Sequence, residues 1–182
     1  MTAIQRLGLL IGAAIALMAA LIILLTASLP QRAAFTGELS VDQIPIAPEI
    51  HALAPDFERM TLVDETLRLS DLRGSPVILN FWATWCGPCI VEMPILQSIF
   101  EQHQAEGLHI LAVNMGESRS IVQRWQDRHE FTYNLLIDED QMVSNLYRLR
   151  GQPSTYVISP DGVITAIFFG PVTETALTAA LG

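Results

Sequence analysis

Cys86 and Cys89 are the residues of this sequence whose type and spacing point most directly to chemistry. They are its only cysteines, and a bond between them would close a loop too short to stabilise a fold. An apolar run over residues 77–82 predicts a buried strand, and a helix is predicted from about Cys86 to Gln104. The start of a helix favours a thiolate. We therefore predict thiol–disulfide exchange, in which Cys86 attacks and Cys89 resolves the mixed disulfide.

The residues beside the pair complete the motif Trp85-Cys86-Gly87-Pro88-Cys89. Two intervening residues let the sulfur atoms bond or separate with little backbone movement. Pro88 stiffens the turn at a helix position where its missing N–H is not needed. We expect Trp85, Gly87 and Pro88 to contribute to substrate binding.

Two other interpretations of the pair are less favoured. Cys86 and Cys89 fit a zinc-finger spacing with His103 and His109, but the cysteines open the predicted helix and His109 falls in a strand. A peroxidatic cysteine usually follows a Thr or Ser three residues earlier, where this chain has Ala83. No metal site is therefore predicted.

Alternating strands and helices predict an α/β fold with a mainly parallel sheet covered on both faces. The turn at residues 160–162 predicts a closing hairpin, which makes the sheet mixed. The predicted strands are 57–63, 66–69, 77–82, 108–114, 135–137, 154–159 and 163–169, and the predicted helices are 86–104, 118–130, 141–149 and 173–181.

The N-terminal segment predicts export of the domain that follows it. Residues 7–29 carry no charge and are long enough to cross a bilayer as a helix, so residues 1–29 are predicted to be a membrane anchor. The alternative is a cleaved signal peptide, whose apolar region is normally shorter. Residues 30–54 contain several prolines and are predicted to be a linker, and residues 55–182 to be the globular domain.

The charge of the chain argues against nucleic acid as a partner. All ten basic residues are arginine, against nineteen acids, and the formal net charge is -9. A protein with no basic patch cannot neutralise phosphates. The simplest interpretation of the acidity is solubility.

Four segments together resemble the thioredoxin superfamily and, more narrowly, the TlpA/ResA-type branch of exported, membrane-anchored thiol–disulfide oxidoreductases. They are residues 54–57, 69–74, 81–89 and 151–158, and the likeness covers about residues 54–170. It implies a thioredoxin-like fold, with a central mixed sheet flanked by helices, an N-terminal β-hairpin and a βα insertion.

The resemblance also assigns roles to residues outside the cysteine motif. Pro153 matches a cis-proline that packs against the redox pair, keeps metal off the thiols and exposes the backbone of Gln152 to a substrate strand. From the residues alone, Pro153 would be an ordinary trans turn residue. Glu92 matches an active-site glutamate that exchanges a proton with Cys89; the alternative is a solvated helix carboxylate. Asn80 stands where thioredoxin has a buried aspartate, so Glu92 is expected to take over its role.

The expected activity is reduction of disulfides in exported proteins at the outer face of the cell membrane. The Gly-Pro dipeptide between the cysteines favours a reductant. No cofactor beyond the disulfide itself is expected, because no nicotinamide or flavin motif is visible. Electrons would come from a transmembrane thiol donor. The resemblance points to apocytochrome c or respiratory-oxidase assembly factors as clients. The alternatives are a disulfide-forming oxidant and a copper(I) metallochaperone.

Overall fold

The computed structural model describes residues 17, 18, 21 and 44–182. The predicted anchor, apart from three of its residues, and the predicted linker up to residue 43 lie outside this range. None of the helices in the described ranges is both long and apolar enough to cross a membrane.

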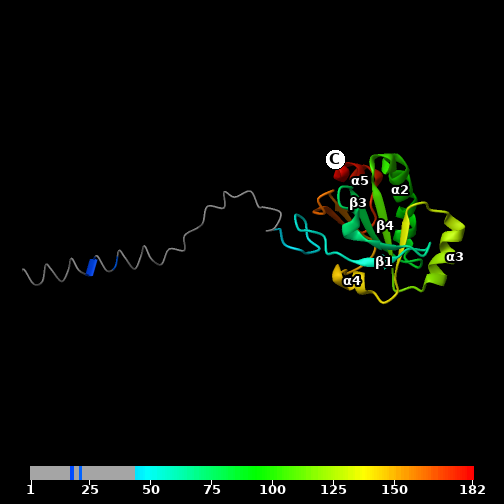
Figure 1. The fold of residues 1–182 in the computed structure, drawn as a ribbon, viewed down its shortest axis with the longest axis horizontal. Coiled ribbons are helices and arrows are strands. Elements are labelled where there is room, and N and C mark those ends of the chain that lie inside the picture. Colours follow the sequence, from blue (N-terminus) through cyan, green and yellow to red (C-terminus); the bar gives the residue numbers. More distant parts are fainter. Residues whose placement is uncertain (1–16, 19–20, 22–43) are drawn as a thin grey trace, which may run out of the picture. The chain divides into compact units, whose positions relative to one another are not determined.

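Five strands form a mixed sheet in the order β5-β4-β3-β6-β7 (Figure 1). The parallel strands are β3 (Val77–Trp82), β4 (His109–Met115) and β5 (Asn134–Asp138). Strand β6 (Ser154–Ile158) runs antiparallel to β3, and β7 (Ile164–Phe169) runs antiparallel to β6. The prediction of a mixed sheet in an α/β fold is confirmed, with the closing hairpin at the predicted turn.

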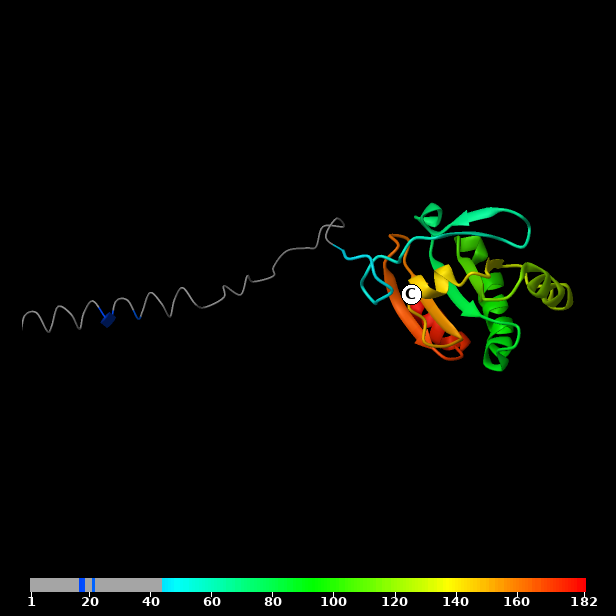
Figure 2. The same ribbon diagram turned by 90° about the horizontal axis from the view of Figure 1, so that it is seen from below.

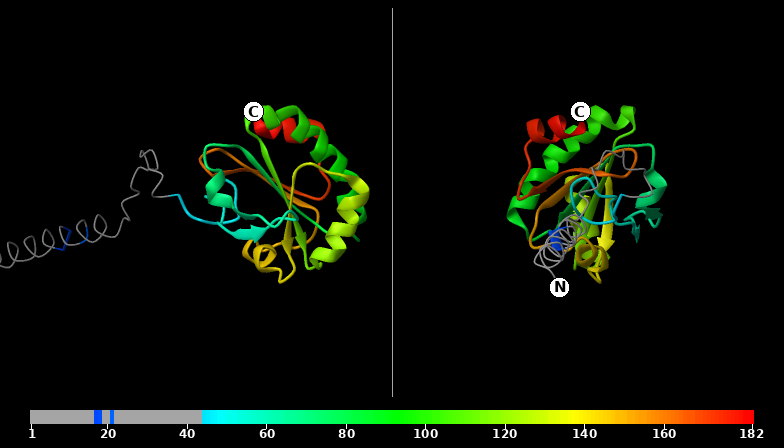
Figure 3. Two further views of the ribbon diagram at one scale, coloured as in Figure 1. Left: turned by 45° about the vertical axis from the view of Figure 1, so that its right-hand side comes forward. Right: turned by 90° about the vertical axis from the view of Figure 1, so that its left-hand side faces the viewer.

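Helices cover both faces of this sheet, which explains why every residue of β3 is buried. One face packs against α2 (Gly87–His103), α3 (Arg119–His129) and α5 (Glu174–Leu181). Figure 3 shows α2 and α5 side by side on that face. The other face packs against α4 (Met142–Leu146) and the segment around Phe57 and Leu69. Strand β5 and α4 supply the predicted βα insertion between α3 and β6.

The predicted N-terminal hairpin is present but shorter than the sequence indicates. Strand β1 (Glu58–Met60) pairs antiparallel with β2 (Thr66–Arg68), and Asp64 in the connection has a positive φ of 62°. Residues 61–63, which the apolar pattern assigns to the first strand, therefore belong to the connection between the two strands. A bridge between Thr61 and Leu136 places the hairpin along the edge of β5.

Helix α4 is also shorter than the predicted 141–149. Its N-cap Gln141 and the nearby Arg148 both have left-handed backbone conformations, with φ of 56° and 51°. These conformations interrupt the helical hydrogen-bond pattern at both ends of α4. The pattern of apolar residues, from which the longer helix was predicted, does not reveal them. The segment from Tyr147 to β6 is consequently a loop.

The domain begins before the predicted boundary at Pro55. The His51 N–H donates to Ile164 O at 2.8 Å, and the Ala54 N–H donates to Gly162 O at 2.9 Å. Ala52 and Ala54 are buried. An edge strand leaves N–H and C=O groups unpaired, and residues 51–54 satisfy part of the outer edge of β7. Figure 2 shows this segment beside β7. The described end of the predicted linker thus packs on the domain.

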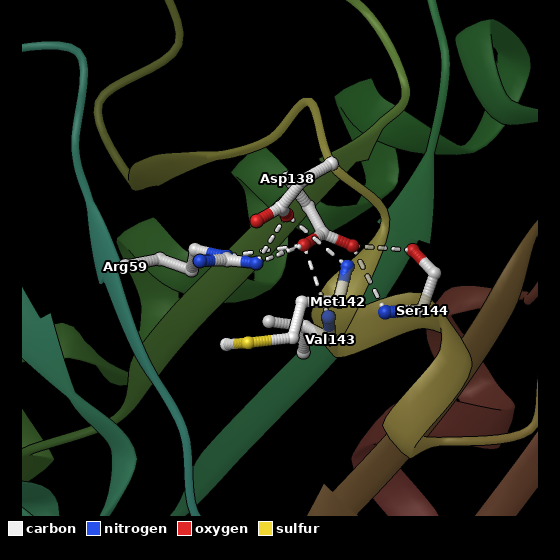
Figure 4. A network of polar contacts seen from close by, with 6 residues as sticks. Arg59, Asp138, Met142, Val143 and Ser144 are labelled. Atoms are coloured by element: carbon white, nitrogen blue, oxygen red, sulfur yellow. Dashed lines mark hydrogen bonds and ion pairs between the residues drawn. The ribbon is translucent and has the colours of Figure 1, made fainter.

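A buried carboxylate ties the hairpin to the sheet and to α4 (Figure 4). Asp138, at the end of β5, accepts hydrogen bonds from Arg59 Nε at 3.0 Å and from Ser144 Oγ at 2.6 Å. It also accepts the N–H groups of Val143 and Ser144, at 3.0 and 2.9 Å. Burial alone would raise the pKa of Asp138, but these donors outweigh it and the pKa is lowered.

Candidate active site at the cysteine pair

Cys86 and Cys89 form a disulfide at the junction between β3 and α2. Their Cα atoms are 5.3 Å apart. Cys86 is the N-cap residue of α2, and its Sγ accepts a hydrogen bond from the Cys89 N–H at 3.3 Å. Cys86 is 5% exposed and Cys89 is fully buried. Of the two, only Cys86 has any exposed surface in the disulfide form.

The motif residues around the disulfide lie at the surface. Trp85 is 69% exposed, and Gly87 and Pro88 are also exposed. Pro88 stands in the first turn of α2, where its missing N–H leaves no hydrogen bond unmade. An exposed tryptophan next to the reactive sulfur offers an apolar contact to a bound chain.

Glu92 lies one helical turn beyond Cys89 and is fully buried, so it is not a solvated helix carboxylate. Its Oε1 accepts a hydrogen bond from Asn80 Nδ2 at 2.6 Å, and its Oε2 accepts the Val172 N–H at 3.0 Å. Burial raises the pKa of Glu92 from 4.5 to about 7, although these two hydrogen bonds oppose the rise. The carboxyl group is therefore poised to gain or lose a proton near neutral pH.

Asn80 connects Glu92 to the middle of the sheet. Its Nδ2 donates to Glu92 and also to Thr155 Oγ1 at 2.9 Å, while its Oδ1 has no hydrogen-bond partner. A turned amide would instead present Oδ1 to a protonated Glu92. Asn80 can thus serve either protonation state of the neighbouring carboxyl group without titrating itself.

The Gln152–Pro153 peptide bond is cis. Ser154, the next residue, pairs with Phe81, so the cis peptide lies at the end of the sheet where β3 leads into the cysteine motif. Pro153 O accepts the Gly170 N–H at 2.9 Å. Val172, two residues after Gly170, donates its N–H to Glu92. The structure therefore brings Gln152 and Pro153 to the same end of the fold as Cys86 and links them to Glu92.

Glu117 is a residue of this site that the sequence analysis did not identify. Its carboxylate accepts the Thr84 N–H and hydroxyl group, both at 2.6 Å, and Asn114 Nδ2 at 2.9 Å. Glu117 is 8% exposed. Three donors on one carboxylate hold the segment that immediately precedes Trp85. The only signal in the sequence is the position of Glu117 just after a buried strand.

Replacing Glu117 with alanine is expected to lower the free energy of unfolding by about 3 kcal/mol, because one buried and two half-buried donors lose their acceptor. Denaturant unfolding of the purified protein measures this loss. Glu139→Ala is the matched control, because Glu139 is exposed and has no side-chain hydrogen bond among residues 44–182. Equal stabilities for the two variants would contradict the role assigned to Glu117.

The zinc-finger spacing does not correspond to a metal site. The cysteines stand at the start of α2, and His103 is its last residue. Because an α-helix rises about 1.5 Å per residue, the two ends of this 17-residue helix are about 24 Å apart. His103 instead pairs with Glu106 at 3.0 Å.

Comparison with known proteins finds thiol–disulfide oxidoreductases that are similar to this chain in sequence and in structure. The AhpC/TSA family model matches residues 50–167. The chain is similar to the thiol-disulfide oxidoreductase ResA of Oceanobacillus iheyensis, with 38% identity over 66% of this chain and 65% of that protein. It is also similar to the thiol-disulfide oxidoreductase ResA of Geobacillus kaustophilus, with 38% identity over 70% of this chain and 74% of that protein. A secreted thiol-disulfide isomerase from Corynebacterium glutamicum has a similar structure, with a TM-score of 0.65 and 29% identity over 71% of this chain and 83% of that chain.

Proposed function

Because the chain belongs to the AhpC/TSA family and to the ResA-type thiol–disulfide oxidoreductases, we propose that it reduces the disulfides of exported client proteins. The observation that carries the proposal is the arrangement at the start of α2. A slightly exposed Cys86 is bonded to a fully buried Cys89, and a buried carboxyl group of raised pKa lies one turn further along the helix.

The reaction begins from the reduced form of the pair. The thiolate of Cys86 attacks one sulfur of the client disulfide, which releases the client's other sulfur as a thiolate and leaves a mixed disulfide. The thiolate of Cys89 then attacks Cys86 Sγ, which forms the intramolecular disulfide and releases the client's first sulfur. The client gains two electrons and two protons, and the protein loses them.

Glu92 acts as the proton acceptor for Cys89 in the second step. Cys89 is fully buried, so its proton has no direct path to solvent. Glu92 lies on the same helical face, and its pKa of about 7 leaves a large fraction ionised at neutral pH. The ionised carboxylate also opposes a thiolate nearby, so proton transfer and attack are expected to occur together.

We also propose the setting in which this chemistry takes place. The uncharged stretch of residues 7–29 supports a single-pass anchor with the catalytic domain on the extracytoplasmic face. A transmembrane thiol donor would then reduce Cys86–Cys89 again. Apocytochrome c and respiratory-oxidase assembly factors are the client classes that the family resemblance favours.

Two alternatives make different demands on the cysteine pair. A disulfide-forming oxidant needs the same geometry with a much higher reduction potential. A copper(I) metallochaperone needs soft ligands, and no His or Cys cluster accompanies the pair among the described residues. The metallochaperone alternative gives no role to the buried Glu92, whereas the oxidant would use it for the same proton transfer in reverse.

The reduction potential of Cys86–Cys89 tests the direction of the reaction. We expect a value near or below about -230 mV for a fragment of residues 44–182 equilibrated in thiol–disulfide buffers. Alkylation of free thiols followed by mass measurement gives the oxidised fraction at each buffer ratio. A value near about -120 mV would make the protein an oxidant and would remove the proposed maturation role.

A further inference from the structure

A cavity of about 550 Å³ adjoins the cis-proline loop. Its lining includes the buried side chains of Tyr147 and Tyr156, whose hydroxyl groups donate to Pro55 O and Tyr147 O. The rest of the lining comes from three separate segments of the chain, which contribute Glu49, then Arg148, Arg150, Gln152 and Pro153, and lastly Phe169. The cysteines do not line it.

The charge of this cavity is opposite to that of the chain as a whole. It contains two arginines and one glutamate, whereas the formal net charge of the chain is -9. Arg148 and Arg150 are exposed, and neither forms an ion pair with any residue that the structure describes. By contrast, Arg59 and Arg119 are engaged by Asp138 and Asp64. The cavity thus presents two guanidinium groups whose hydrogen-bonding capacity is available to a ligand.

The position of the cavity relates it to a bound client. Gln152 and Pro153 belong both to its lining and to the end of the sheet that carries the disulfide. Phe169 pairs with Ser154 across the strands and is 75% exposed at the same place. A client chain that has one cysteine at Cys86 and its backbone along Gln152 would therefore pass the cavity within a few residues.

We propose that this cavity binds an aspartate or glutamate side chain of the client, close in sequence to the cysteine that is attacked. The inference rests on the proposed reductase function and adds a preference among clients. A guanidinium group recognises a carboxylate through charge-assisted, often bidentate hydrogen bonds, and Phe169 covers the apolar part of the side chain. Since both arginines are exposed, we expect a modest preference of about two- to fivefold.

The test compares two disulfide peptides that differ only in an aspartate or an asparagine near the attacked cysteine. The reduced full-length protein should reduce the aspartate peptide with a kcat/KM about two- to fivefold higher. The Arg148→Gln/Arg150→Gln variant should lose this preference. The matched control, Arg124→Gln/Arg128→Gln, removes two exposed arginines from α3, away from the cavity, and should retain it.

Two further measurements separate the possible failures. Raising the salt concentration from about 0.05 M to about 0.5 M should reduce the preference in the unaltered protein, which tests the charge effect without a variant. A preference that persists in the Arg148→Gln/Arg150→Gln variant, or that is absent from the unaltered protein, would overturn the inference. Reduction of a neutral small disulfide reports the proposed function separately: if it proceeds while the peptides are not distinguished, only the inference about the cavity fails.

Discussion

Cys86→Ala is expected to lower the rate of disulfide reduction by at least about 10³-fold, because the remaining thiol cannot reach a client. Cys89 is fully buried behind Cys86, and only Cys86 occupies the N-cap position of α2. The loss concerns chemistry rather than folding, since the disulfide closes too short a loop to contribute much stability. Reduction of a peptide disulfide, with unfolding followed in parallel, measures both quantities.

The partner variant Cys89→Ala provides the control. It keeps the attacking thiol and removes the resolving one, so it should form a mixed disulfide with the client and stop there. Mass measurement of the covalent adduct identifies the residue that holds the client. Turnover by Cys89→Ala at the unaltered rate, or an adduct on Cys89 in Cys86→Ala, would refute the assigned order of attack.

Glu92→Gln is expected to slow resolution of the mixed disulfide by about 10²-fold near pH 7 and above. In the unaltered protein the rate should rise as the pH passes about 7, where Glu92 loses its proton and can accept one from Cys89. The variant should lack this rise. Glutamine suits the site sterically, because Asn80 can turn its amide to satisfy the new NH₂ group. Single-turnover kinetics over a range of pH measure the effect.

Stability gives an independent check on the same carboxyl group. Because the pKa of Glu92 rises from 4.5 to about 7 on folding, the folded protein holds the proton more tightly between these values. The free energy of unfolding should therefore fall as the pH rises through this range, by about 3 kcal/mol in total. Glu92→Gln should remove that decline, and Glu139→Gln, at an exposed position, should keep it. A decline that survives in Glu92→Gln would show that another group titrates.

The elements of the fold could be predicted from sequence wherever the pattern of burial is simple. Strand β3 has the predicted bounds because both faces of the sheet are covered, which produces a continuous apolar run. Helix α4 and strand β1 were predicted too long, because the left-handed residues that end or replace them leave no clear mark in the hydrophobic pattern. The early start of the domain was missed because residues 51–54 are held mainly by backbone hydrogen bonds.

The active site was predictable in part and for different reasons. The cysteine pair could be predicted from the spacing of the two residues and from their position at the start of a predicted helix. The burial of Glu92 depends on α5 and on Val172, which lie about eighty residues away, so the helix sequence alone could not reveal it. Glu117 acts through the backbone and side chain of Thr84, and no local motif marks such a contact. The cis peptide at Pro153 was anticipated from family resemblance and not from the residues.

For the proposed membrane-anchored protein, the packing of residues 45–54 on the domain would limit how far the domain reaches from the bilayer. With the proposed anchor ending at residue 29, only residues 30–44 remain as a tether, because Pro45 is already hydrogen-bonded to Leu53. A fully extended chain covers about 3.3 Å per residue, so the tether reaches at most about 50 Å. A tether running to residue 54 would have reached about 80 Å. A reductase anchored in this way would therefore serve only a thin layer next to the membrane, within reach of the proposed transmembrane thiol donor.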